Sequence, residues 1–198
     1  MSDIAGCYDL SRIRPKVQSV LRRVNTLGRD KFTARALGID IDARALADAR
    51  AALGLNWLQP APRLSVRLGA FEEVDAELTG FDAAVMLETI EHIPLGHLPR
   101  VERAVFAAMH PHLLLVTTPN QEYNVLHGMA AGRKRHPGHH FEWTRAQFQQ
   151  WANGVAQRQG YSVSFSDLGP PDPVRGSSTQ MARFLSLRVR PLCEANVL

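Results

Sequence analysis

The sequence has little cysteine and no long apolar run, and each shortage narrows the possible classes of protein. Two of the 198 residues are cysteines, Cys7 and Cys193, and they lie near opposite ends of the chain. A disulfide framework and a thiolate zinc site are therefore not expected, and a reducing, cytoplasmic setting is the default. No apolar run approaches the roughly 20 residues that span a bilayer, and residues 1–20 lack the pattern of a signal peptide. We expect no membrane partner.

Basic residues are only mildly in excess of acidic ones, and the net charge is +4. Its distribution is more informative, because Arg133, Lys134 and Arg135 stand beside His136 in a segment punctuated by glycine and proline. Clustered cations suit a phosphate-bearing partner, and a solvated loop is the plain alternative. Length and a hydrophobic content of 45% fit one domain over residues 1–198 with a sizeable core.

Short apolar strands alternate with helices along the chain. Strands are predicted at the N-terminus and at residues 34–42, 64–68, 81–87, 112–117, 161–167 and 181–189, and helices at 11–28, 43–53, 99–109 and 145–159. Thr144 is a good N-cap for the last helix and Gly160 a natural end. The alternation predicts an α/β domain with a largely parallel sheet, and the last two strands predict an antiparallel hairpin at one edge. Residues 121–140 lack clear periodicity and are interpreted as a functional or partly mobile loop.

Three polar side chains follow the strand that ends at Leu87: Glu88, Glu91 and His92. In parallel sheets, ligands bind beyond the carboxyl ends of the strands. Two carboxylates and an imidazole suit Mg²⁺ or Mn²⁺ better than a thiolate-loving ion. The alternative is that the acids merely begin a helix, whose dipole favours them.

Asp40 ends another predicted strand, about thirty residues after a strand that leads into a glycine turn. This arrangement is typical of nucleoside-binding domains, in which the acid accepts hydrogen bonds from ribose hydroxyls. An acid that simply lies in solvent at a strand end is the alternative.

Four short strings occur in order: Glu88-x-x-Glu91-His92, Thr118-Pro119-Asn120-x-Glu122-Tyr123-Asn124, His139-x-Phe141-Glu142-Trp143-Thr144-Arg145 and Ser178-Thr179-Gln180-Met181. Together they resemble the Hen-type small-RNA 3′-terminal 2′-O-methyltransferases, from about Gly38 to Phe184. The resemblance implies a Rossmann-like class I methyltransferase that uses S-adenosylmethionine to methylate the 2′-OH of an RNA 3′ end. It also implies a metal and substrate loop at about 119–143, and an RNA-repair or small-RNA pathway protein as a possible partner.

The resemblance assigns roles to particular residues. It implies that Mg²⁺ or Mn²⁺ is held by Glu88, Glu91, His92 and His139, and that the ion contacts both hydroxyls of the terminal ribose. A metal lowers the pKa of a hydroxyl, and contact with the 2′-OH selects RNA over DNA. His92 or His136 would accept the released proton. The residues assigned to the cofactor are Asp3, Gly6, Asp40, Ala70, Phe71 and Leu87.

The chain departs from the family's pattern at two places. The first turn, Gly6-Cys7-Tyr8-Asp9, lacks a second glycine, so the turn has been rebuilt, the chain is truncated, or cofactor binding is impaired. Gly138 stands where relatives have an acid, which would orient the imidazole of His139, so weaker metal binding is expected. Arg145 is expected to bind phosphate or to pair with Glu142.

Two other functions stay open from the sequence. One is a methyltransferase-like module that binds RNA 3′ ends with impaired catalysis. The other is a methyltransferase that acts on a small-molecule diol. Measuring the affinity for S-adenosylmethionine distinguishes the binding module from the leading hypothesis. Comparing RNA that ends in ribose with RNA that ends in 2′-deoxyribose distinguishes the small-molecule methyltransferase from it.

Overall fold

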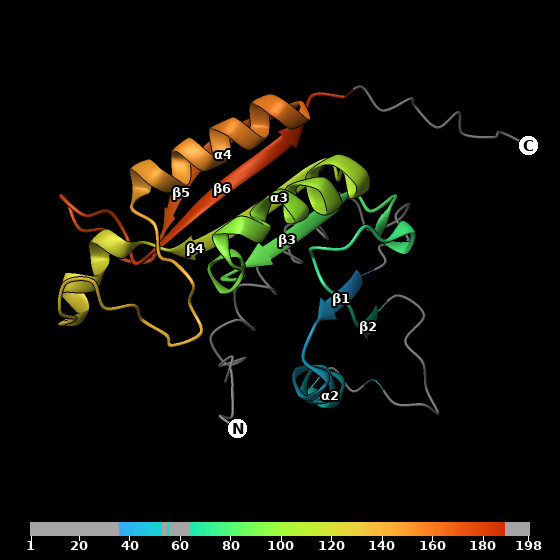
Figure 1. The fold of residues 1–198 in the computed structure, drawn as a ribbon, viewed down its shortest axis with the longest axis horizontal. Helices are drawn as coiled ribbons and strands as arrows, with labels where there is room; N and C mark the ends of the chain where they lie inside the picture. Colours follow the sequence, from blue (N-terminus) through green and yellow to red (C-terminus); the bar gives the residue numbers. More distant parts are fainter. Residues whose placement is uncertain (1–35, 53–54, 56–63, 189–198) are drawn as a thin grey trace, which may run out of the picture. The chain divides into compact units, whose positions relative to one another are not determined.

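A computed structural model describes residues 36–52, 55 and 64–188 (Figure 1). Asp3, Gly6 and the predicted elements at the N-terminus lie outside the described residues. The chain divides into two compact units between Ala70 and Phe71, and each unit is described by itself. Among the described residues, no helix is both long and apolar enough to cross a membrane.

The first unit contains a β-α-β arrangement. Strand β1 (Ala36–Asp40) pairs in parallel with β2 (Leu64–Leu68), and helix α2 (Ala43–Ala52) lies between them in the chain. The strands approach closely at Gly38, where an added Cβ would lie 3.1 Å from Cγ1 of Val66. These two predicted strands and the predicted helix are confirmed, and β1 ends at Asp40, two residues before the end of the predicted range.

The second unit is built on a four-stranded sheet in the order β3-β4-β6-β5. Strands β3 (Ala83–Leu87) and β4 (Leu113–Pro119) are parallel. Strand β6 (Thr179–Ser186) runs antiparallel to β4 and to β5 (Tyr161–Leu168), which forms the edge. The predicted α/β class and the antiparallel hairpin at one edge are therefore confirmed.

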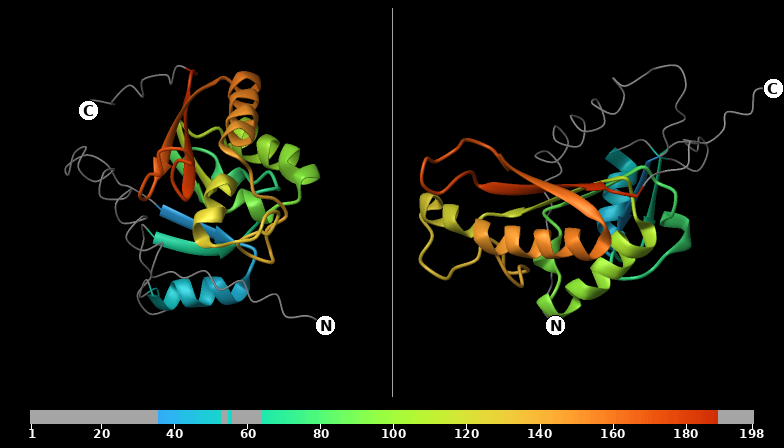
Figure 2. Two further views of the ribbon diagram at one scale, coloured as in Figure 1. Left: turned by 90° about the vertical axis from the view of Figure 1, so that its left-hand side faces the viewer. Right: turned by 90° about the horizontal axis from the view of Figure 1, so that it is seen from above.

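Two longer helical segments cover one face of this sheet (Figure 2). Helix α3 (Leu98–Val101) continues as the π-helix η4 (Glu102–Met109) and ends at His110, which has a left-handed backbone at φ 43°. Helix α4 (Arg145–Gln159) begins with a capping box between Thr144 and Gln147 and ends at Gly160. The remaining helical segments are short 3₁₀ turns: η1 (Ala76–Leu78), η2 (Ile90–His92), η3 (Leu95–His97) and η5 (Gln121–His127).

Aromatic side chains fill the space between the helices and the sheet. Phe106, Phe148 and Phe184 are fully buried, and Phe106 meets Phe184 edge to face with ring centroids 5.0 Å apart. The hydroxyl of Tyr161, also buried, donates to the carbonyl of Pro111 at 2.9 Å. Met86 of β3 and Val116 of β4 belong to the same buried core, which packs the strands that precede the candidate site.

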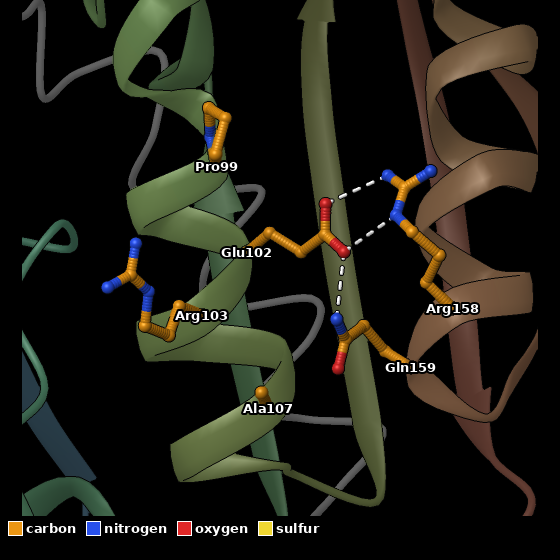
Figure 3. A pocket seen from close by; sticks show the side chains of 6 residues that line it. All are labelled: Pro99, Glu102, Arg103, Ala107, Arg158 and Gln159. Atoms are coloured by element: carbon orange, nitrogen blue, oxygen red, sulfur yellow. Dashed lines mark hydrogen bonds and ion pairs between the residues drawn. The ribbon is translucent and has the colours of Figure 1, made fainter.

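Glu102 connects the two helices, as Figure 3 shows. Its carboxylate accepts two hydrogen bonds from the guanidinium of Arg158, at 2.8 and 2.9 Å, and one from Gln159 at 2.8 Å. A pocket of about 480 Å³ lies here, and its lining consists of Pro99, Glu102, Arg103, Ala107, Arg158 and Gln159. None of the predicted site residues lines this pocket.

Candidate functional site

The site begins where β3 ends, at Glu88. The backbone of Glu88 is left-handed, with φ 48°, and its N–H donates to the carbonyl of Thr117 at 3.1 Å and to its hydroxyl at 3.0 Å. The same hydroxyl donates to Oε1 of Glu88 at 3.0 Å. Strand β4 therefore fixes both the backbone and the carboxylate of Glu88.

Glu91 lies on the next turn, η2, and is fully buried. Its Oε2 accepts a hydrogen bond from the hydroxyl of Thr118 at 3.0 Å. Within the part of the chain that the structure describes, its Oε1 is buried without a hydrogen-bond partner. Burial, followed by the nearby charge of Glu88, raises the pKa of Glu91 well above its ordinary value. A buried carboxylate oxygen in this state suits a bound cation, which would supply the missing charge.

A loop after η5 brings two more imidazoles to His92. The ring centroids of His92 and His139 lie 4.7 Å apart, and those of His92 and His136 lie 5.6 Å apart. Ligand nitrogens of the three side chains lie within 4.8 Å of one another, a grouping that does not include the two glutamates. The N–H of His140 donates to the carbonyl of Glu91 at 2.7 Å and ties the loop to η2. The predicted His92 and His139 are thus brought together.

Hydrogen bonds assign the tautomers of these imidazoles. Nδ1 of His139 lies 2.6 Å from Oε1 of Glu142, and Nδ1 of His92 lies 3.2 Å from the carbonyl of Gly138. Both partners only accept, so Nδ1 carries the proton and Nε2 carries the lone pair in each neutral ring. His136 has the opposite tautomer, because its Nδ1 accepts a hydrogen bond from the N–H of Gly138 at 3.0 Å. His92 and His139 can therefore offer Nε2 to a metal, whereas His136 in this arrangement carries its proton on Nε2.

His92 is also held in its neutral form. Burial, together with the neighbouring His139, lowers the pKa of His92 to about 4. A neutral imidazole is the form that binds a metal. Two carboxylates and the Nε2 atoms of two imidazoles thus fit the donor types that Mg²⁺ and especially Mn²⁺ accept.

Gly138 lies beside His136 and His92 in the structure, and the weaker metal binding expected from it stays a prediction. A Cβ at this position would lie 3.0 Å from Nδ1 of His136 and 3.4 Å from Nδ1 of His92, so an acid here would contact those two rings. His139 already has its carboxylate partner in Glu142. Sequence reasoning missed this role of Glu142, although its place three residues after His139 was visible within the quoted string.

The basic segment of the loop is used largely inside the protein. Nζ of Lys134 donates to the carbonyls of His139 and His140 at 2.6 and 3.1 Å. The guanidinium of Arg135 donates to the carbonyls of Asn120 and Ser178 at 2.6 and 2.9 Å. Two of the three cations that suggested a phosphate-bearing partner therefore stabilise the loop, because their donors are taken by carbonyl oxygens.

Arg145 pairs with Glu122 in the structure and not with Glu142, and phosphate binding by Arg145 stays a prediction. Its guanidinium donates to Oε2 of Glu122 at 2.7 and 3.1 Å. Phe141 is buried in the core and Trp143 packs against that core. The string from His139 to Arg145 therefore combines one metal-ligand candidate with residues that anchor it.

The residues predicted to bind cofactor are distributed over both units. Asp40 lies at the end of β1, where its Oδ1 accepts the N–H of Asp42 at 2.8 Å. Ala70 is the last residue of the first unit, and Phe71, the first of the second, packs partly against the core. Leu87 is the last residue of β3. Their joint use by a cofactor, like the single-domain assignment, stays a prediction.

Comparisons with known proteins agree with these features. No protein-family model matches the chain. It is similar to the small RNA 2′-O-methyltransferase of Gallus gallus, with 38% identity over 123 residues that cover 60% of this chain and 32% of that protein. The chain therefore spans about a third of that relative's length.

Among solved structures, the methyltransferase domain of bacterial CtHen1 is similar at 34% identity, with a TM-score of 0.70 over 87% of this chain and 95% of that one. A chain of the Pnkp1/Rnl/Hen1 RNA repair complex shares the fold, with a TM-score of 0.55 at 19% identity over 83% of this chain and 34% of that one. The likeness to the bacterial domain runs through nearly all of that domain.

Proposed function

This chain belongs to the Hen1-type small-RNA 2′-O-methyltransferases, as a methyltransferase domain, and from this membership we propose that it methylates RNA 3′ ends. The proposed reaction transfers the methyl group of S-adenosylmethionine to the 2′-oxygen of the 3′-terminal ribose. One observation supports it above others: Glu91 is buried with an Oε1 that lacks a hydrogen-bond partner among the described residues, while the next residue, His92, is grouped with His139.

We assign Glu88, Glu91, His92 and His139 as the residues that hold Mg²⁺ or Mn²⁺. When bound, the ion supplies Lewis acidity that lowers the pKa of the ribose hydroxyls. The carboxylates contribute two negative charges, of which the one on Glu91 has no counter-charge within hydrogen-bonding distance among the described residues. The hydroxyls of Thr117 and Thr118 each donate a hydrogen bond to one oxygen of these carboxylates and so orient them.

The two roles first expected of His92 exclude each other. If Nε2 is a metal ligand while Nδ1 donates to Gly138, the ring has no lone pair left to accept a proton. We therefore keep His92 as a ligand and let the proton of the 2′-hydroxyl pass to water. His136, with its proton on Nε2, is better placed to donate a hydrogen bond to a phosphate oxygen near the RNA end.

For the cofactor we propose that Asp40 binds the ribose hydroxyls of S-adenosylmethionine. Its Oδ1 is used by the N–H of Asp42, which orients the carboxylate and leaves Oδ2 for the ligand. Because a Hen1 chain occurs in the Pnkp1/Rnl/Hen1 complex, we also propose an RNA-repair protein as the partner that delivers the substrate.

The experiment is a transfer assay with radiolabelled S-adenosylmethionine and a short RNA, with and without Mn²⁺. We expect label on RNA that ends in ribose, none on the same RNA ending in 2′-deoxyribose, and none without metal. Equal labelling of both RNAs would reject the 2′-hydroxyl as the acceptor. Absence of both transfer and cofactor binding would favour the RNA-end-binding module.

A further inference from the structure

Glu142 is a buried carboxylate that makes no direct contribution to the proposed ligand set. Its side chain is 0% exposed, and Oε1 accepts hydrogen bonds from Nδ1 of His139 and from the backbone N–H of Arg135, both at 2.6 Å. Oε2 accepts the side-chain amide of Asn124 at 2.6 Å. Three donors thus surround a group that, when ionised, only accepts.

The contacts of Glu142 assign the proton that it shares with His139. Oε2 faces the amide of Asn124 and Oε1 faces the backbone N–H of Arg135, so both carboxylate oxygens already accept hydrogen bonds. The proton in the 2.6 Å contact with His139 is therefore assigned to Nδ1 of the imidazole. In the neutral ring, Nε2 then carries the lone pair.

We propose that Glu142 is the positioning residue of this site, which fixes His139 as the Nδ1–H tautomer and orients Nε2 toward the metal. This inference rests on the proposed function. A carboxylate behind a metal-binding imidazole fixes its ring orientation and strengthens it as a ligand. Glu142 acts through His139 and touches neither metal nor substrate in this assignment.

Glu142 is itself held in one orientation by a closed network. Nε of Arg135 donates to Oδ1 of Asn124 at 2.5 Å, which compels Asn124 to present its NH₂ group to Glu142. The rest of the Arg135 guanidinium donates to the carbonyls of Asn120 and Ser178, which lie next to the ends of β4 and β6. A chain of hydrogen bonds through Glu142, Asn124 and Arg135 thus connects His139 to the sheet.

A purely structural role in the loop would also explain why Glu142 is buried. Two variants distinguish that role from the positioning of His139. Glu142→Leu removes the acceptor that faces Nδ1 of His139. Asn124→Leu replaces a buried polar side chain in the same network but leaves the contact between Glu142 and His139. Both changes put leucine in place of a buried polar side chain of the loop, whereas only the first removes the acceptor that faces Nδ1 of His139.

The measurement is imidazole ¹⁵N NMR of the metal-free full-length chain, followed by Mn²⁺ titration of the wild type and both variants. We expect the Nδ1–H tautomer of His139 in the wild type and in Asn124→Leu, and a mixture of tautomers in Glu142→Leu. Mn²⁺ affinity should fall about 10–100-fold in Glu142→Leu. In Asn124→Leu it should fall clearly less than in Glu142→Leu, because Oε1 of Glu142 still faces Nδ1 of His139.

An Nε2–H tautomer of His139 in the wild type would overturn the inference, even if neither variant folded. Equal losses of Mn²⁺ affinity in the two variants would also overturn it, because that result indicates a structural role. If the wild type binds no Mn²⁺, the proposed metal site fails, whereas the tautomer spectra of the metal-free protein still decide the role of Glu142.

Discussion

The backbone of Glu88 has a conformation that few residues with a side chain adopt. At φ 48° a Cβ is crowded by the following carbonyl, and this conformation costs roughly 1–2 kcal/mol relative to glycine. The hydrogen bond from the N–H of Glu88 to the hydroxyl of Thr117 compensates, and the hydrogen bond that this hydroxyl donates to Oε1 of Glu88 directs the carboxylate. Strain of this kind persists where the surrounding contacts over-determine it, which is common at functional sites.

We expect this strain to reverse the usual order of alanine and glycine. Glu88→Gly should be at least as stable as Glu88→Ala, and by up to about 1 kcal/mol more stable, because glycine escapes the strain but loses more chain entropy on folding. Urea unfolding of the two variants is the measurement. At Glu102, inside a helix, alanine should be more stable than glycine by about 1 kcal/mol. The same order at both positions would contradict the prediction.

Glu91 should behave as a residue that binds metal at the expense of stability. In the metal-free chain, Glu91→Gln should raise the free energy of unfolding by about 1 kcal/mol, because it removes a buried charge whose Oε1 lacks a partner. In the wild type, Mn²⁺ should increase stability, and in Glu91→Gln this increase should disappear. Thermal unfolding with and without Mn²⁺ measures both effects. Exposed Glu73→Gln is the control, and an equal response of the two variants would exclude Glu91 as a ligand.

At the scale of elements, the sequence predicts the start and end of a helix most reliably where neighbouring residues determine them. Helix α4 begins and ends at the predicted residues, because Thr144 and Gln147 cap its start and Gly160 ends it. The 3₁₀ helix η5 was missed, since the Asn120 side chain that caps it is held by carbonyls of Arg175 and Ser177, more than fifty residues away. Non-local contacts of this kind leave no periodic pattern in the sequence.

The link between helices η4 and α4 should add a small stability that depends on pH. Hydrogen bonds from Arg158 lower the pKa of Glu102 below its ordinary value of 4.5. A lowered pKa means that the unfolded chain binds the proton more tightly. The stabilisation is therefore full above the ordinary glutamate range and is lost as pH falls through the lowered pKa.

Arg158→Met should remove this dependence. Because the side chain of Arg158 is 57% exposed, solvent screens the pair, and we expect a loss below about 1 kcal/mol at pH 7. The difference in unfolding free energy between wild type and variant should shrink toward zero as the pH is lowered. Urea unfolding of both proteins at a series of pH values from 7 into the acidic range measures this difference. A difference that stays constant over this range would show that the ion pair contributes nothing and that packing explains the loss.

At the scale of the whole molecule, the sequence predicted the ligand types better than the way they are held. Glu88, Glu91 and His92 follow one strand, and their grouping was therefore visible in the sequence. The resemblance alone added His139, which lies on a distant loop. The supporting contacts of Thr117, Glu142 and Arg135 depend on how β4, the loop and β6 pack together in space. The spacing of residues along the chain does not predict that packing.

The two proposed ligands should be separable by mutation, because Asp40 and the metal-ligand candidates lie in different compact units. Asp40→Ala, in the first unit, should lower affinity for S-adenosylmethionine about tenfold or more, which corresponds to the loss of one charge-assisted hydrogen bond. Mn²⁺ should still stabilise this variant, by about 2.7 kcal/mol at one hundred times the dissociation constant. His139→Ala, in the second unit, should show the reverse: cofactor affinity retained and stabilisation by Mn²⁺ lost. Calorimetric titration with each ligand measures all four values. Loss of Mn²⁺ binding in Asp40→Ala would mean that the metal site depends on the first unit, and the assignment of all four metal ligands to the second unit would then be wrong.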